Sequence, residues 1–220
     1  MTSIARKVLM ALSGFFLLVF LLQHMSINFL SVISADAFNE VSHFMGTNPL
    51  IQYALQPVLA FGFLFHIAMG IVLEYQNRNS RSIKYVSSNP SENTTWMSRN
   101  MIITGIMVML FLGLHFYDFW IPELNTKYIE GDMSGLAPDG DFRYFAELQH
   151  KFHDPIRVGL YVLSFVFLSL HLLHGFHSAF QSVGFNHRRY TPMIKKLAKI
   201  YAVVVPLGFV VIAVYHFLVQ

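Results

Sequence analysis

Five long apolar stretches constrain the fold of this chain more than any other feature of its sequence. They run approximately from Val8 to Ile33, Leu50 to Leu73, Met101 to Ile121, Ile156 to Phe180 and Leu197 to Val219. Crossing the hydrocarbon core of a bilayer takes about 20 apolar residues, and in lipid a helix satisfies its own backbone hydrogen bonds. The sequence therefore predicts an all-α integral membrane bundle of five transmembrane helices, with residues 1–220 forming a single domain.

The composition agrees with a membrane protein and excludes several kinds of site. Hydrophobic residues make up 55% of the chain and charged residues 12%, against roughly 25% charged residues in soluble domains. The chain has no cysteine. Disulfides, thiolate zinc sites, cysteine-held iron-sulfur clusters and the covalent attachment of a c-type haem are therefore excluded.

The basic residues are distributed unevenly between the two ends of the predicted helices. Eleven of the fifteen fall on the side of the N-terminus: Arg6, Lys7, Arg78, Arg81, Lys84, Arg99, Arg188, Arg189, Lys195, Lys196 and Lys199. Because basic residues concentrate on the cytoplasmic side of membrane proteins, we expect a cytoplasmic N-terminus. The basic charge reflects topology, so it requires no nucleic-acid partner.

Two of the outer connections are expected to contain short helices. Ser34 to Gly46 has a polar start and a glycine stop. The second connection, Asp141 to His153, has an apolar stripe at a spacing of three to four residues: Phe142, Phe145, Leu148 and Phe152. We expect this stripe to pack on the bundle or to lie in the membrane interface. The chain contains no low-complexity stretch and no convincing repeat.

Histidines lie well inside each of the first four apolar stretches, and the fourth carries three in the segment SLHLLHGFHS. With a helical rise of 1.5 Å per residue, His24 and His115 lie about 27 and 23 Å from the inner helix ends. By the same rise, His66 and His171 lie about 12 and 15 Å from that side. The four histidines thus form an outer and an inner pair, roughly 10 Å apart in depth.

Two pairs at two depths match what two six-coordinate haems stacked across a bilayer require, with one imidazole from each of two helices at each iron. The alternative is that each ring simply hydrogen-bonds to the next helix. For one isolated histidine we would favour that alternative, but for four in two matched layers we favour haem ligation. The sequence predicts His24 and His115 as the axial ligands of a distal haem, and His66 and His171 as those of a proximal haem.

The inner pair has a further feature, a glycine four residues after each histidine, at positions 70 and 175. We expect the missing side chains to leave gaps for a macrocycle edge. This offset favours His171 over His174 as the fourth ligand, and we assign His174 to a propionate or a neighbouring helix. A non-haem metal site at His171, His174 and His177 is a weaker alternative, because no acidic residue follows Arg157. The remaining histidines are expected to be exposed or interfacial: His43, His150, His153, His187 and His216.

The motifs around these histidines resemble a known family. LLQHMSIN, FLFHIAMG, LGLHFYDFW and LSLHLLHGFHSAF occur in the order found in the dihaem cytochrome b membrane anchors of succinate:quinone oxidoreductases. The likeness is to the single-polypeptide anchors of succinate dehydrogenases and fumarate reductases, and it spans essentially the whole chain. The family's axial ligands map onto the same four histidines.

This resemblance implies a subunit of an enzyme complex in the bacterial inner membrane. The anchor would relay electrons through two b-type haems between quinone, here menaquinone, and a flavoprotein and an iron-sulfur subunit on the cytoplasmic face. Some members carry an acid two positions before the fourth ligand, linked to proton movement, and this chain has Ser169 there. An acid of the first outer loop, such as Glu40, would handle the protons of the quinone.

Two alternative functions remain open from the sequence. One is the cytochrome b subunit of a hydrogenase, formate dehydrogenase or nitrate reductase, which also holds two haems in a small bundle. The other, from a different class, is a transporter whose intramembrane histidines relay protons. The lack of mid-span acids and of clear broken-helix signals argues against the transporter.

Overall fold

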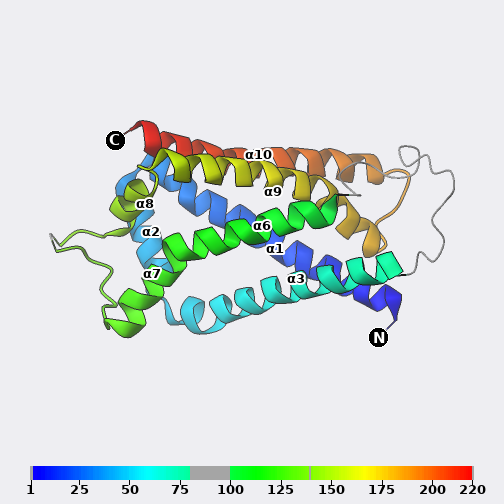
Figure 1. Cartoon of the computed structure of the whole chain (residues 1–220), viewed down its shortest axis with the longest axis horizontal. Helices are drawn as coiled ribbons and strands as arrows, with labels where there is room; N and C mark the ends of the chain where they lie inside the picture. The colour runs from blue at the N-terminus through cyan, green and yellow to red at the C-terminus, as the bar shows by residue number, and fades with distance from the viewer. Residues whose placement is uncertain (1, 80–99, 139, 220) are drawn as a thin grey trace.

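The computed structural model describes residues 2–79, 100–138 and 140–219, and their regular structure is helical (Figure 1). Five long helical segments form the bundle: α1 (Ser3–Ile33), η1 with α3 (Ile51–Leu55 and Gln56–Asn79), α6 through η3 (Met101–Ile129), α9 (Pro155–Ser182) and α10 (Thr191–Leu218). All five are long and apolar enough to cross a membrane. The predicted fold class is therefore confirmed for the described residues.

The helices are longer than the apolar stretches that predicted them. The first begins at Ser3 because Thr2 caps it, with the Thr2 hydroxyl accepting a hydrogen bond from the amide of Ala5. Asp154 caps α9 in the same way. The third span continues past α6 through two π-helical turns, η2 (Phe116–Trp120) and η3 (Asn125–Ile129), separated by the short α7 (Ile121–Leu124).

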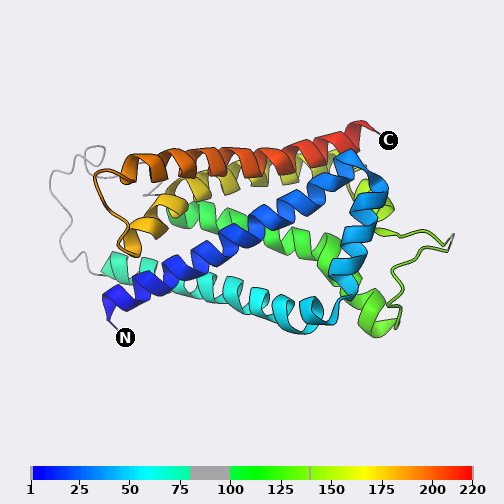
Figure 2. The ribbon, with the colours of Figure 1, turned by 180° about the vertical axis from the view of Figure 1, so that it is seen from behind.

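The two ends of the bundle differ (Figures 1 and 2). One end holds the N-terminus and the α9–α10 connection, and the other holds the C-terminus with α2 (Ala35–Thr47) and α8 (Tyr144–Lys151). We call these the inner and outer ends. A cytoplasmic inner end stays a prediction, and Arg81, Lys84 and Arg99, on which it partly rests, lie outside the described residues.

The core lies between α9 and α10, which run side by side in both views, with α1 packed against both. Small side chains on α10 allow this close approach, since Ala198, Ala202 and Ala213 are almost wholly buried. Pro206 lies inside α10 and lacks the amide hydrogen that would bond the carbonyl of Ala202. The hydroxyl of Ser169 on α9 donates to that carbonyl instead, at 2.6 Å.

In contrast, α3 lies at the edge of the bundle, on the side opposite α10 (Figure 1). It packs mainly on α1 and contacts α6 only slightly. None of its described residues is buried. The protein core therefore does not enclose α3.

The outer end is closed by α2 and α8. The predicted stripe of Asp141 to His153 does pack on the bundle, because Leu148 and Phe152 are buried in the core and Phe145 contacts the ring of His216. The expectation that His216 is exposed or interfacial was wrong, since only 1% of its surface is accessible. Its Nε2 lies 2.9 Å from the hydroxyl of Ser31 on α1.

Ion pairs hold the outer connection to the third span. Arg143 forms ion pairs with Glu123 at 2.5 Å and with Glu147 at 2.7 Å. The buried Lys127 also pairs with Glu123, at 2.7 Å, and it donates a hydrogen bond to the carbonyl of Gly46. Burial lowers the pKa of Arg143, but its hydrogen bonds to Glu147 and Glu123 outweigh this effect and raise the pKa above its ordinary value. The outer cap is thus fixed by charge as well as by apolar packing.

Candidate functional site: two histidine pairs in the bundle

His24 on α1 and His115 on α6 lie beside one another in the outer half of the bundle. Their ring centroids are 5.8 Å apart and the ring planes are 80° to each other. His115 is the last residue of α6, directly before the π-helical turn η2, and such turns occur often at functional sites. The structure thus brings together the two residues that the sequence assigned to the distal haem, while their ligand role stays a prediction.

Aromatic side chains surround this outer pair. Phe20 stacks on His24 at 5.3 Å between ring centroids, and Phe119 lies 5.3 Å from His115. The Nδ1 atom of His115 is buried and has no hydrogen-bond partner among the described residues. A buried polar nitrogen without a partner is costly, and an unpartnered group of this kind points to a missing ligand or a missing water molecule.

His66 on α3 and His171 on α9 form the inner pair. They lie close enough to interact electrostatically. The Nδ1 of His66 is 3.0 Å from the hydroxyl of Ser13, and the Nδ1 of His171 is 3.3 Å from the hydroxyl of Thr104. The structure therefore also brings together the two residues assigned to the proximal haem, and each has a hydroxyl partner on a neighbouring helix.

The other two histidines of SLHLLHGFHS continue along α9 toward the inner end. His174 interacts electrostatically with both His171 and His177. The Nε2 of His177 is buried and finds no hydrogen-bond partner within residues 2–79, 100–138 and 140–219. Among the described residues no group of three or more metal-ligating side chains could hold a metal ion. The non-haem site at these three histidines therefore gains no support, while the propionate role of His174 stays a prediction.

The gaps expected beside the inner histidines are partly filled. A Cβ atom built at Gly70 would lie 3.6 Å from the methyl carbon of Met10, and one at Gly175 would lie 3.3 Å from that of Met101. The prediction of open gaps overlooked these two side chains, which come from α1 and α6. Both are the ends of flexible thioether side chains, which adapt easily to a neighbouring group.

The arrangement suits b-type haem. Imidazole nitrogens come in pairs from separate helices, which is the donor set of a six-coordinate haem. Among the described residues, Nδ1 of His115 in the outer pair has no hydrogen-bond partner. At the inner pair, the edge position of α3 means that no closely packed core separates His66 from His171. The residues present therefore fit the cofactor.

Asp118 is a buried acid beside the outer pair that the sequence analysis did not single out. It lies on η2, three residues after His115, and only 1% of its surface is accessible. Its Oδ2 accepts a hydrogen bond from the hydroxyl of Tyr161 at 3.0 Å and lies 3.2 Å from Nε of Arg157. Its Oδ1 is buried and has no hydrogen-bond partner in the part of the chain that the structure describes. The motif LGLHFYDFW contains this signal, an acid one helical turn from a predicted ligand.

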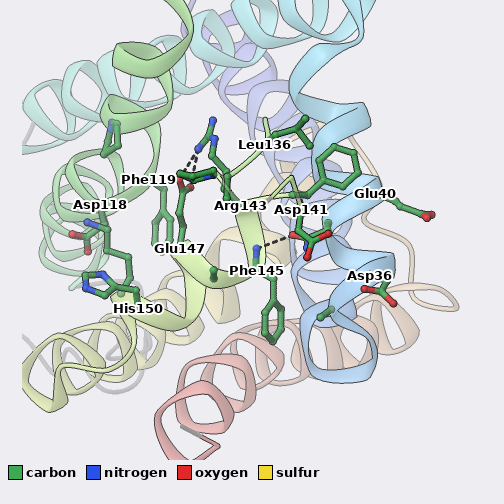
Figure 3. Close-up of a pocket in the computed structure, with 18 residues that line it drawn as sticks. Asp36, Glu40, Asp118, Phe119, Leu136, Asp141, Arg143, Phe145, Glu147 and His150 are labelled. Carbon is green, nitrogen blue, oxygen red and sulfur yellow. Dashed lines mark hydrogen bonds and ion pairs between the residues drawn. The ribbon is translucent and has the colours of Figure 1, made fainter. Parts of the chain in front are cut away.

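A pocket of about 990 Å³ opens at the outer end, between the outer connections and the bundle (Figure 3). Asp118 and Phe119 line one wall, so the pocket begins directly beside His115. The opposite wall is formed by α2 with Asp36 and Glu40 (Figure 3). The acid that the resemblance suggested for proton handling, Glu40, therefore does line a cavity next to the outer pair.

Five helices that could cross a membrane and histidines paired inside the bundle are features expected of the class of small integral membrane cytochromes b. Consistent with this class, the chain is 22% identical over 161 residues to the succinate dehydrogenase cytochrome b558 subunit of Bacillus subtilis (strain 168). The match covers 73% of this chain and 69% of that relative. The resemblance noted in the sequence is thereby supported. No protein-family model matches the chain, and no solved structure matches it.

Proposed function

We propose that this chain is a membrane-anchor subunit that relays electrons through two b-type haems between a cytoplasmic-side iron-sulfur subunit and menaquinone. The observation that carries the proposal is the pairing of four intramembrane histidines from separate helices at two positions in the bundle. Haem iron supplies one-electron transfer, and two sites in sequence replace one long transfer across the bilayer with two short ones.

The similarity to a succinate dehydrogenase cytochrome b subunit supports a membrane-anchor role in a succinate:quinone oxidoreductase. It favours this role over a cytochrome b of a hydrogenase, formate dehydrogenase or nitrate reductase, and over a proton-relaying transporter. The chain is accordingly part of an enzyme complex, and its five apolar helices fit a multi-pass protein of the bacterial inner membrane.

The histidines would hold the two haems at different depths. We assign His24 and His115 to the haem at the outer end, and His66 and His171 to the haem at the inner end. Electrons would enter at the inner end, where the flavoprotein and iron-sulfur subunits would dock. Basic residues of the first helix and of α10, such as Lys7, Lys195 and Lys199, would contribute to that docking face.

Quinone would react in the outer pocket, because this cavity of about 990 Å³ is lined by Phe119, whose ring centroid lies 5.3 Å from that of His115. Asp118 lies on the wall nearest His115, and its unpartnered Oδ1 is able to accept a proton. Arg157 and Tyr161 would hold the carboxylate in place. Glu40, on the opposite wall, would exchange protons with the outer solvent (Figure 3).

The test is to purify the chain from membranes with its attached subunits. We expect two b-type haems per polypeptide in the visible spectrum and in a haem assay, and we expect a flavoprotein and an iron-sulfur protein to co-purify. Succinate should reduce the haems, and added menaquinone should reoxidise them. A colourless chain, or one that carries haem but associates with hydrogenase or formate dehydrogenase subunits, would contradict the proposal.

A further inference from the structure

The inner histidines are contacted by the same short motif on two different helices. Residues 10–14 of α1 read Met-Ala-Leu-Ser-Gly, and residues 101–105 of α6 read Met-Ile-Ile-Thr-Gly. Both fit the pattern Met-x-x-Ser/Thr-Gly. We call these two segments the α1 cradle and the α6 cradle. The α1 cradle contacts His66 of α3, and the α6 cradle contacts His171 of α9.

Each cradle makes three equivalent contacts with its partner helix. The hydroxyl of Ser13 or Thr104 lies against Nδ1 of the histidine. The glycine faces the ring itself, since a Cβ built at Gly14 would lie 3.6 Å from Cε1 of His66, and one at Gly105 would lie 3.5 Å from Cε1 of His171. The methionine methyl lies beside the glycine one turn after the histidine. Two unrelated helix pairs thus repeat one arrangement.

The hydroxyl groups determine which ring nitrogen carries the proton. A hydroxyl has a single hydrogen. Ser13 donates it to the carbonyl of Met10 at 2.8 Å, and Thr104 donates to the carbonyl of Met101 at 2.9 Å. Each hydroxyl oxygen is then left as an acceptor, so the ring Nδ1–H must donate to it. In a neutral imidazole this leaves Nε2 unprotonated, with its lone pair available to a metal.

The outer pair lacks this arrangement. The side-chain amide nitrogen of Asn28 lies 3.3 Å from Nδ1 of His24 and donates a hydrogen bond to the backbone carbonyl of His24. Asn28 therefore presents a donor to the ring of His24, not an acceptor. Nδ1 of His115 has no partner among the described residues. At His216 the hydroxyl of Ser31 is also an acceptor, but it accepts from Nε2 of the ring. Nε2 then carries the proton, so it has no lone pair available to bind iron.

We infer that Ser13 and Thr104 are positioning residues of the inner haem, which fix the tautomer of His66 and His171 and increase the basicity of the ligating nitrogens. The inference rests on the proposed function. Metal-bound histidines usually donate their second ring nitrogen to an acceptor, and removing that acceptor typically costs 10- to 100-fold in metal affinity. A stronger donor ligand favours ferric iron, so loss of the hydroxyl should raise the midpoint potential of the inner haem.

The test measures haem content and the midpoint potential of each haem in the purified complex. Thr104→Val removes the hydroxyl at nearly constant volume, Ser13→Ala does so on the other helix, and Thr104→Ser retains it. We expect the two hydroxyl-free variants to raise the potential of the inner haem, or to lose that haem about 10 to 100 times more readily. The outer haem should be unchanged, and Thr104→Ser should behave as the wild type.

Ser31→Ala is the matched control. Ser31 lies on α1, as Ser13 does, and its hydroxyl also accepts a hydrogen bond from a buried histidine. That histidine is His216, which is not one of the proposed haem ligands. The substitution should leave the inner haem unaffected even if it lowers stability. Unchanged potentials and haem content in both Ser13→Ala and Thr104→Val would overturn the inference, as would an equal effect of Ser31→Ala. If instead no haem depends on His66 and His171, the proposed function itself fails.

Discussion

The hydroxyl of Ser169 on α9 donates a hydrogen bond of 2.6 Å to the carbonyl of Ala202 on α10. That carbonyl lies four residues before Pro206, which has no amide hydrogen to offer it. In some members of the family that the sequence resembles, an acid at the position of Ser169 is linked to proton movement. In this chain the hydroxyl of Ser169 supplies the hydrogen bond that the backbone of α10 cannot make at Pro206.

Replacing Ser169 with alanine should therefore destabilise the packing of α9 on α10. Hydrogen bonds between membrane helices contribute about 1 kcal/mol, so we expect a loss of that size in thermal unfolding of the detergent-solubilised protein. In a Pro206→Ala background the regained amide hydrogen can bond Ala202, and the loss should shrink. Equal losses in both backgrounds would show that the hydroxyl does not substitute for the missing amide.

Replacing His24 or His115 with alanine should remove the outer haem and leave the inner one, because the two rings would hold a single iron between them. The measurement is the haem-to-protein ratio together with a redox titration. His216→Ala is the control, since this histidine is also buried in the outer half but has a protein partner. Loss of a haem in the control, or retention of both haems in the His115 variant, would contradict the assignment.

Asp118→Asn should slow quinone reduction without affecting electron entry. The substitution removes the carboxylate that would accept a proton beside the outer pair, and positioned acids and bases typically contribute 100-fold or more to proton-transfer steps. In the assembled complex we expect succinate to reduce both haems normally while the rate of menaquinone reduction falls by about that factor. Asp36→Asn, on the far wall of the pocket (Figure 3), should have a much smaller effect. Similar losses in both variants would argue against a specific role for Asp118.

Stability in strongly alkaline solution should depend on Tyr144 in the outer cap. Burial, followed by the nearby charge of Glu123, raises the pKa of Tyr144 from 10.0 to about 12. Above pH 10 the unfolded chain releases this proton while the folded protein retains it. The contribution of Tyr144 to the stability of the folded protein is therefore fully present below pH 10 and is lost as the pH rises toward 12.

The hydroxyl of Tyr144 has no hydrogen-bond partner among the residues that the structure describes, so Tyr144→Phe should fold normally. Thermal unfolding of the wild type and of this variant, compared across pH 9 to about 12, tests the assignment. The wild type should lose more stability than the variant over this window. Parallel curves would show that another group is responsible.

The spans could be predicted from sequence because an apolar run of this length has few other uses. Their ends could not, since polar residues such as Ser3 and Asn79 continue a helix beyond the apolar core once its hydrogen bonds are established. The pairing of histidines by depth needed only the helical rise, and the structure places His24 beside His115.

Other parts of the site depend on rotation about the helix axes, which apolar sequence patterns define poorly. Asp118 lies in the motif LGLHFYDFW, but this motif does not reveal that η2 turns the acid into the bundle. His216 was expected to be exposed or interfacial, yet α10 presents it to α1. Ser13 and Thr104 resemble ordinary small residues until the helices opposite them are known. The two cradles are also too short to stand out as a repeat.

The peripheral position of α3 has a consequence for biogenesis. The core of α1, α9 and α10 is complete without α3, so these helices can consolidate in the bilayer before any prosthetic group arrives. Since α3 contributes a histidine but no buried side chain, closing it onto the bundle requires little rearrangement of the core. Loading of the inner haem can then be a late step, in which α3 closes onto the bundle and brings His66 to the haem from the side.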